Sequence, residues 1–565
     1  MTSRIGIDNP PRHSAPCPFW FWNGTMNADE IKRQMRLMRE AGITEFLIHG
    51  RYGLKTEYLS EDWFAAVRAA VDEAKKTGMR AWLYDELNWP SGSAGGKVTA
   101  DRGLCEHYIG PDGNLRLTTA ADISPDYLNG KATQKFISFT HEEYRKRFGR
   151  HFGSTIPGFF NDEVRFENSR PWSATLGKRI LIGTKYFKAT AAAISRNYFR
   201  KLSRWCGSRK MKFIGHVMGE ETVGSNVRYM SDIFSCLAEF HEPGIDHLGK
   251  SAEGFHHRPA ATVGRLFDRP VTCEMGGGLT WDFCIQDLYR ISGWLYANGV
   301  TRIIPHAFFY EENQSDWPPD MFFRWKGWPD MAEYIAWAGK IQYFLSIAKP
   351  VRKVSLYYPL EEFWSDFKPD PAFTLNFGDK GPVVTGAGAL AIHRSLQELS
   401  ASLYSRNIDF DLVPRRWLGK VRDSVLIAPA DTDPAFGGQL IRQKGRSSEE
   451  TVSEVERILG PRPSIRGKGV NPGLAGIRDN ISDPYIHESK DLGGVLIREY
   501  LFQGRKAWMV WNAGEKEFTG QCVIPALKEA EVRILPGGSG PVIMTNLKGA
   551  FEISLPSRTM AVILA

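Results

Sequence analysis

Acidic side chains stand at the ends of several short apolar runs in this chain of 565 residues. One such residue alone is usually a helix cap or half of an exposed ion pair. Several carboxylates that converge on one face repel one another, so a site must use them to offset that cost. Two carboxyl groups can cleave a glycosidic bond, because one protonates the leaving oxygen and the other attacks the sugar or activates water. The candidates are Asp85, Glu86, Asp162, Glu163, Glu220, Glu221 and Glu274.

Eight short apolar runs alternate with amphipathic helical stretches between residues 18 and 345. The alternation predicts an α/β fold with a parallel sheet, and eight units of this length are typical of a (β/α)8 TIM barrel. All strand ends of a barrel open onto one face, which holds the active site. A doubly wound open sheet also places polar groups at strand ends and is the alternative. The expected strands are 18–22, 45–50, 81–84, 158–160, 212–216, 244–247, 270–273 and 302–306.

Glu163 and Glu274 form the sharpest pair of catalytic candidates. Glu163 follows the fourth apolar run and Glu274 follows the seventh. Many retaining glycosidases of the barrel type carry the acid/base Glu at the end of strand four and the nucleophile Glu at the end of strand seven. The match to that arrangement requires that the sixth run, 244–247, is counted as a strand.

Aromatic and polar side chains beside the strand ends predict the walls of a sugar pocket. Aromatic faces suit the apolar C–H faces of a pyranose ring, and neutral imidazoles can contact hydroxyl groups. For each tryptophan the alternative is a place in the barrel core, and for each histidine a structural hydrogen bond. We expect substrate contacts from Trp22, His49, Asp85, Glu86, Trp89, Asp162, His216, Glu221, His306 and Tyr310.

The segment Ser91–Gly96 is rich in glycine and serine. A phosphate-binding loop would show the GxGxxG or GxxxxGK[ST] pattern, and this segment shows neither. We therefore expect a tight loop that lies over the site.

Two further domains are predicted after the barrel. Buried strands near 354–358 and 423–429, with a helical stretch at 390–404, indicate a smaller open α/β domain. The later apolar runs are separated by glycine-rich turns, which favours a C-terminal β-sandwich. The expected boundaries are 15–349 for the barrel, 350–493 for the small α/β domain and 494–565 for the β-sandwich.

Composition excludes several classes of protein. The formal net charge of +8 comes without a long basic run, which argues against nucleic-acid binding. The basic cluster at 415–422 is most simply a solvated face, and a contact in a homo-oligomer is the alternative. Seven scattered cysteines without CxxC spacing indicate reduced thiols in a cytoplasmic protein. Neither a signal peptide nor a membrane-spanning run is visible.

Several motifs resemble those of glycoside hydrolase family 106, the α-L-rhamnosidases and their relatives. The resemblance covers residues 15 to 345. It implies an exo-acting hydrolase that releases a terminal L-rhamnose or a similar sugar by inversion. It also implies a role for a calcium ion in binding sugar hydroxyls. The motifs are Pro18-Phe-Trp-Phe-Trp-Asn-Gly24, Tyr84-Asp-Glu86, Asn88-Trp-Pro-Ser-Gly92 and Gly158-Phe-Phe-Asn-Asp-Glu163.

The strand positions of Glu163 and Glu274 favour retention of stereochemistry, whereas the motif resemblance implies inversion. Retention requires carboxyl groups about 5 to 5.5 Å apart, and inversion about 6.5 to 9.5 Å. We favour inversion, because the motif resemblance extends over the whole barrel. The alternatives are a retaining, β-galactosidase-like barrel and a non-catalytic carbohydrate-binding barrel, although intact carboxylates at four strand ends speak against the second. Residues 351–494 contain no cysteine, so a cysteine-dependent amidotransferase there is excluded.

Overall fold

The structure is a computed structural model that describes most of the chain. No helix among the described residues is both long enough and apolar enough to cross a membrane. The described residues are 6–110, 112–118, 123–177, 183–248, 256–278, 280–368, 386–430, 432–466, 494–514, 516–525, 527–535, 542–544, 547–557 and 559–565.

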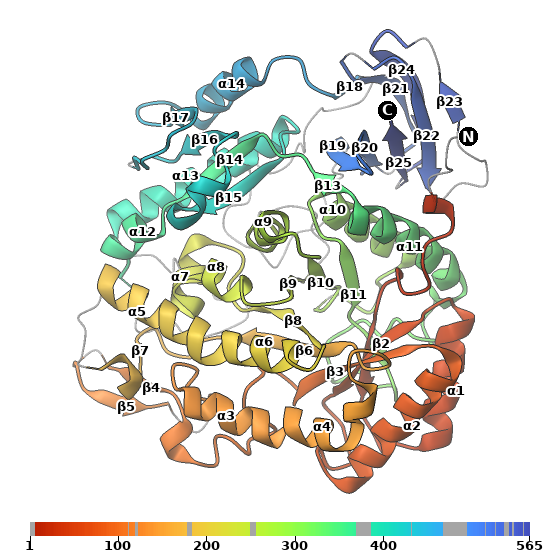
Figure 1. The fold of residues 1–565 in the computed structure, drawn as a ribbon, viewed down its shortest axis with the longest axis vertical. Helices are drawn as coiled ribbons and strands as arrows, with labels where there is room; N and C mark the ends of the chain where they lie inside the picture. The colour runs from red at the N-terminus through yellow and green to blue at the C-terminus, as the bar shows by residue number, and fades with distance from the viewer. Residues whose placement is uncertain are drawn as a thin grey trace.

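Parallel strands form a nearly closed barrel with helices around it, which confirms the predicted fold class (Figure 1). Each predicted barrel strand is present, and the strands are neighbours in the sheet in the same order as in the chain. The order in the sheet is β11-β10-β9-β8-β6-β3-β2-β1-β12. The bounds are β1 Phe19–Trp22, β2 Glu45–Gly50, β3 Arg80–Leu87, β6 Gly158–Val164, β8 Lys212–Val217, β9 Glu242–His247, β10 Thr272–Met275, β11 Arg302–Pro305 and β12 Phe308–Phe309.

The eighth strand of the barrel is divided into two pieces, and this division closes the sheet. β11 pairs with β10 in parallel, whereas β12 pairs with β1. Only His306 and Ala307 separate the two pieces. The backbone N–H of Cys17 also donates a 3.1 Å hydrogen bond to the carbonyl of Ile303. One stretch of chain therefore spans both edges of the sheet.

The helices around the barrel begin and end at residues that suit those positions. Asn27 caps α1 by accepting hydrogen bonds from two backbone N–H groups, and Ser60 caps α2 by accepting one from the backbone N–H of Trp63. Gly78 ends α2 in the left-handed conformation that glycine favours. The helices are α1 Ala28–Glu40, α2 Glu61–Thr77, α3 Gly130–Phe139, α4 His141–Phe148, α5 Thr184–Ile194, α6 Arg200–Gly207, α7 Val223–Met230, α8 Ile233–Leu237, α9 Arg258–Phe267, α10 Ile285–Ala297 and α11 Met331–Ile347.

A small antiparallel sheet, which the sequence patterns did not predict, is inserted between the third and fifth barrel strands. It has the order β5-β4-β7. Its strands are very short: β4 His107–Ile109, β5 Leu115–Leu117 and β7 Pro171–Trp172.

A four-stranded parallel sheet, of order β15-β14-β16-β17, lies beside the barrel and is cyan in Figure 1. This part of the chain contains both strands and helices, as the apolar runs indicate. The elements are β14 Val354–Tyr358, α12 Leu360–Asp366, α13 Ala387–Ser405, β15 Phe410–Pro414, β16 Val425–Ala428, β17 Leu440–Arg442 and α14 Ser448–Leu459.

Two antiparallel sheets form the last part of the chain. A shared core that includes Ile465, Val510 and Phe551 lies between them, as in a sandwich. Two short strands from earlier in the chain, β13 and β18, join these sheets. The first sheet comprises β13 Lys349–Pro350, β19 Val495–Phe502, β20 Arg505–Asn512, β25 Met560–Leu564, β22 Ala530–Leu535 and β23 Val542–Met544, and the second comprises β18 Ser464–Arg466, β21 Phe518–Val523 and β24 Ala550–Leu555.

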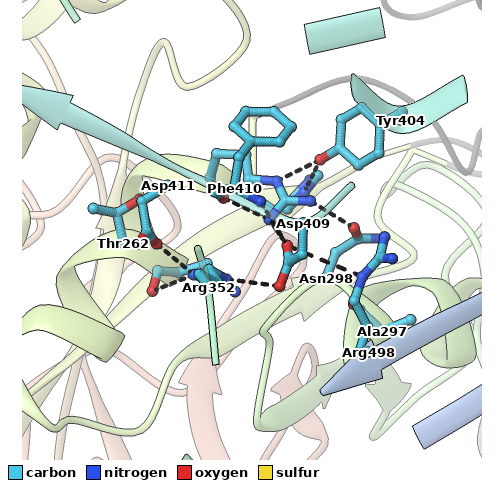
Figure 2. A network of polar contacts seen from close by, with 12 residues as sticks. Thr262, Ala297, Asn298, Arg352, Tyr404, Asp409, Phe410, Asp411 and Arg498 are labelled. Atoms are coloured by element: carbon cyan, nitrogen blue, oxygen red, sulfur yellow. Dashed lines mark hydrogen bonds and ion pairs between the residues drawn. The ribbon is translucent and has the colours of Figure 1, made fainter. Parts of the chain in front are cut away.

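A buried network of charged groups joins the three parts of the molecule (Figure 2). Arg258 of α9 and Arg352, which precedes β14, both pair with Asp409. Arg352 also pairs with Asp411 at 2.7 Å, and Arg498 of β19 lies 4.0 Å from Asp409. Burial would raise the pKa of Asp409, but the charges of the three arginines outweigh burial and hold this pKa well below its usual value.

Candidate active site

The imidazole of His216, near the end of β8, is the centre of a cluster of acidic groups. Its Nε2 lies 3.0 Å from Oδ1 of Asp162 and 3.1 Å from Oε2 of Glu274. Its Nδ1 lies 3.6 Å from Oε1 of Glu220. The hydroxyl of Tyr84 donates a 2.5 Å hydrogen bond to the other carboxylate oxygen of Asp162. The ends of β3, β6, β8 and β10 therefore supply one connected polar network inside the barrel.

A local irregularity brings two consecutive acidic residues to the same place. The register between β6 and β8 shifts between Asn161 and Val164. Glu163 lies within this shift and has a φ of +42°, in the left-handed region. A regular strand would point Asp162 and Glu163 to opposite faces. The bulge instead lets both of them border one pocket.

The pocket opens beside this cluster at the carboxyl ends of the strands. Its acidic wall contains the two catalytic candidates from β6 and β10, and its other wall is largely aromatic. Trp89 is half-buried and Trp317 is exposed. The lining residues are Arg51, Trp89, Asp162, Glu163, Asp246, Leu248, Glu274, Gly277, Gly278, His306 and Trp317.

Burial changes the protonation of the acidic groups. Burial, and then the negative charge of Asp162, raises the pKa of Glu163 to about 8. The same two causes raise the pKa of Glu274 to about 7. Burial would also raise the pKa of Asp162, but the hydrogen bond and the charge of His216 lower it instead. At neutral pH, Glu163 is therefore protonated beside an ionised Asp162.

His216 carries a positive charge in this arrangement. Burial would lower its pKa, but its hydrogen bonds to Asp162 and Glu274 raise that pKa well above the usual value. His306, in contrast, is neutral, because burial and then the charge of Arg51 lower its pKa to about 3. The Nε2 of His306 lies 3.9 Å from Oε1 of Glu274.

Asp162, His216 and Glu274 are also the groups that could hold a metal ion, since one donor atom of each lies within 4.8 Å of the others. This set does not fit calcium, which prefers six to eight oxygen ligands. The Nε2 of the imidazole lies within hydrogen-bonding distance of both carboxylates, and the raised pKa of His216 keeps the ring protonated. The charge of the imidazolium already balances one carboxylate.

Trp22 and Tyr310 do not contact the pocket, and the expectation that they bind a sugar is wrong. Trp22 is fully buried, and its ring packs against Trp20 and Trp63 on the outer side of the barrel. Alternation along β1 turns Phe21 inward and its tryptophan neighbours outward. The hydroxyl of Tyr310 accepts a hydrogen bond from the backbone N–H of Asn27, so its role is to hold the start of α1.

Asp85 and Glu86 lie at the end of β3 as expected, but neither borders the pocket. Asp85 accepts hydrogen bonds from Ser91, at 2.6 Å, and from Asn161, at 2.9 Å. The two carboxylate oxygens of Glu86 accept hydrogen bonds from five backbone N–H groups, which are those of Leu87, Gly92, Ser93, Ala94 and Gly95. Both acids therefore fasten the loop 88–96, and the expectation of direct substrate contact is wrong.

His49 and Glu221 are also set back from the pocket lining. The ring of His49 is stacked on Tyr84 with 3.5 Å between the ring centroids, inside the barrel. Glu221 is half-buried, and it is the preceding residue, Glu220, that faces His216. Of the predicted site residues, the structure brings Trp89, Asp162, Glu163, Glu274 and His306 to the pocket, with His216 directly behind them.

Among the pocket residues missing from the predicted set are three with charged or aromatic side chains: Arg51, Asp246 and Trp317. Asp246 lies on β9, and its buried Oδ1 has no hydrogen-bond partner among the described residues. Burial, and then the charge of Glu274, raises the pKa of Asp246 well above its usual value. Its place in the sixth apolar run was a usable signal, as was the place of Arg51 directly after β2.

The fold is similar to solved structures of glycoside hydrolases. A rhamnosidase from Novosphingobium sp. PP1Y matches with a TM-score of 0.68 and 10% identity, over 99% of this chain and 83% of that chain. A β-galactosidase from Bacillus circulans sp. alkalophilus matches with a TM-score of 0.62 and 12% identity, over 98% of this chain and 100% of that chain. The chain therefore has the fold of barrel glycoside hydrolases.

Sequence comparison alone reaches less far. No family model matches the chain. A segment of 91 residues is 26% identical to a protein of Formosa agariphila that is provisionally named a β-glucuronidase. The match covers 15% of this chain and only 8% of that curated relative.

Proposed function

We propose that the chain is an exo-acting glycoside hydrolase that removes a terminal sugar, with an α-L-rhamnosidase-like activity. The observation that carries the proposal is the shared pocket of Glu163 and Glu274 at the carboxyl ends of β6 and β10. The fold shared with a rhamnosidase and a β-galactosidase supports the class of reaction. The family 106 motifs quoted above support the choice of rhamnose.

Glu163 is suited to be the general acid. Its pKa of about 8 leaves it protonated at neutral pH, so it can donate a proton to the leaving oxygen. Arg165 lies with Nη1 3.4 Å from Oε2 of Glu163, and its charge stabilises the carboxylate that forms after proton transfer.

Glu274 is suited to be the base. Its pKa of about 7 leaves a large share ionised at neutral pH, and the hydrogen bond from His216 orients the carboxylate. In an inverting reaction Glu274 takes a proton from the attacking water. The ionised Asp162 stands next to it and stabilises the positive charge that develops on the sugar ring.

A retaining, β-galactosidase-like reaction is the second candidate. The positions of Glu163 and Glu274 at the fourth and seventh strands favour it. In that case Glu274 attacks the anomeric carbon, the aglycone leaves with the proton of Glu163, and water then releases the sugar from Glu274.

A panel of aryl glycosides tests both candidates. We expect release of the aglycone from an α-L-rhamnoside, with the inverted anomer as the first product in the NMR spectrum. EDTA should leave the rate unchanged, because His216 balances the acidic centre without a cation. A retained anomer, together with trapping of a glycosyl azide by a Glu274→Gly variant, would favour the second candidate. Absence of turnover on every glycoside would contradict the proposal.

A further inference from the structure

The lining of the pocket also contains a buried arginine that is paired with an aspartate. Arg51 is 4% exposed, and its Nε donates to both carboxylate oxygens of Asp316, at 3.2 and 3.0 Å. The guanidinium lies between two aromatic rings, 4.4 Å from the centroid of Phe21 and 4.3 Å from that of Trp89. The rings and the carboxylate hold the plane of the guanidinium in one orientation.

The two terminal nitrogens of Arg51 have no hydrogen-bond partner among the described residues, although the side chain borders the pocket. A guanidinium group fixed through its Nε presents its remaining N–H donors as a planar fork. Two neighbouring hydroxyl oxygens on a sugar ring match such a fork, and the ring can stack on Trp89 or on the exposed Trp317.

The charges around the pocket decide which sugars can enter. Four of the lining residues are acidic: Asp162, Glu163, Asp246 and Glu274. The cations nearby are all matched, since Arg51 pairs with Asp316, His216 with two carboxylates and Arg165 with Glu163 and Glu167. The carboxylate of a uronic acid would therefore lose its hydration without meeting an unmatched cation, which is unfavourable.

We propose that the Arg51–Asp316 pair is the specificity determinant of the pocket: Arg51 binds two neighbouring hydroxyl groups of a neutral sugar, and its neutralisation by Asp316 excludes uronic acids. This inference rests on the proposed function in taking a sugar as the occupant, and it names the class of that sugar. The pair would therefore select against glucuronides as substrates.

The pair can be tested by changing one partner at a time. Asp316→Asn keeps the shape and the oxygen that accepts the N–H of Trp317, but it leaves the charge of Arg51 unmatched. We expect the ratio of kcat/KM for an aryl galacturonide to that for the matched galactoside to rise at least about tenfold. Arg51→Lys keeps the charge and removes the fork, so kcat/KM for neutral glycosides should fall at least about tenfold.

The ion pair between Glu30 and Arg33 on α1 is the matched control. Arg33 donates to Glu30 through Nε and a terminal nitrogen, and, like that of Arg51, its guanidinium lies beside an aromatic ring, 4.8 Å from the centroid of Phe323. Glu30→Gln and Arg33→Lys should leave both kinetic ratios within about twofold of the wild type, because a surface pair of this kind contributes at most about 1 kcal/mol.

Binding of free sugars separates failure of this inference from failure of the proposed function. Calorimetry with L-rhamnose, D-galactose and D-galacturonic acid measures selection without any turnover. The protein could bind neutral sugars in a way that depends on Arg51 and yet hydrolyse no glycoside. That result would contradict the proposed function and support the role of the Arg51–Asp316 pair in sugar selection. Tighter binding of galacturonic acid by the wild type, unchanged ratios in both variants, or binding of none of the three sugars would overturn the inference.

Discussion

The molecule has two clusters of buried charge, and they are built in opposite ways. In the junction cluster of Figure 2, three arginines surround Asp409 and Asp411, and the pKa of Asp409 is held low. In the pocket cluster, acidic groups outnumber cations, and the pKa values of Glu163 and Glu274 are raised. In the junction cluster both acids are paired with arginines, whereas the acidic groups of the pocket cluster repel one another.

The difference shows how to tell a structural use of buried charge from a chemical one. A cluster in which every acid is paired with a cation is costly to break, but it has no group that is ready to exchange a proton near neutral pH. A cluster of like charges in a pocket shifts pKa values towards neutrality, as acid–base catalysis requires. Burial alone does not make this distinction, since both clusters are buried.

Removing the central acid of the junction cluster should have the largest effect. Asp409→Asn leaves three buried arginines short of a partner, and we expect a loss of about 3–5 kcal/mol in the free energy of unfolding. Because the pKa of Asp409 is lowered on folding, its contribution is present above about pH 4 and is lost as the pH falls further. Urea denaturation at two pH values measures this, and kcat of the folded fraction should not change. A large loss of kcat with normal stability would contradict the structural role.

The same kind of change in the pocket cluster should affect turnover instead. Glu163→Gln and Glu274→Gln keep the shape and remove the titrating group, so each should lower kcat by about 100-fold or more. Their thermal unfolding should stay at or above that of the wild type, because burial opposes the ionisation of each carboxyl group in the folded state but not in the unfolded chain. Near-normal turnover by both variants would assign the chemistry to other acidic residues of the pocket.

The pH dependence of kcat/KM sharpens the contrast. Glu274 must be ionised and Glu163 protonated, so activity should be highest between about pH 7 and pH 8. It should fall about tenfold per pH unit outside this range. In Glu163→Gln the residual activity should lose its decline at high pH, while the decline at low pH remains. A profile with no decline above pH 8 in the wild type would exclude Glu163 as the acid.

The smallest effect is expected outside both clusters. Trp22→Phe replaces a ring that packs only in the core by a smaller one. We therefore expect the free energy of unfolding to fall by about 1 kcal/mol. KM should not change, whereas Trp89→Phe should raise KM because this ring borders the pocket. A rise in KM for Trp22→Phe comparable with that for Trp89→Phe would restore Trp22 to the sugar site.

The strands of the barrel could be predicted because each apolar run is long enough to be seen and ends in polar residues. The inserted sheet could not, since strands of two or three residues, such as Pro171–Trp172, have no periodicity. The alternation of Phe and Trp over Phe19–Trp22 predicts that the two residue types lie on opposite faces of the strand. It does not predict which face points into the barrel. The neighbours decide that: Phe19 and Phe21 fill the barrel and the tryptophans face the helices.

The acidic half of the site could also be predicted, because carboxylates at strand ends are visible in the sequence. The roles within it could not. In the sequence, the pair Asp85 and Glu86 looks the same as the pair Asp162 and Glu163. Only the hydrogen bonds from the following loop show that the first pair has a structural role. Trp317 lies well beyond the end of β12, in the loop after the eighth barrel strand, so no pattern at the strand end marks it.

The loop that Glu86 fastens is an anion cradle whose anion belongs to the protein itself. Gly92, Gly95 and Gly96 have positive φ, and successive N–H groups of this kind form a concave nest that suits a phosphate. Here a carboxylate from the preceding strand occupies the nest as an internal ligand. The wall that presents Trp89 is consequently assembled before a sugar arrives, and binding has little loop entropy left to lose.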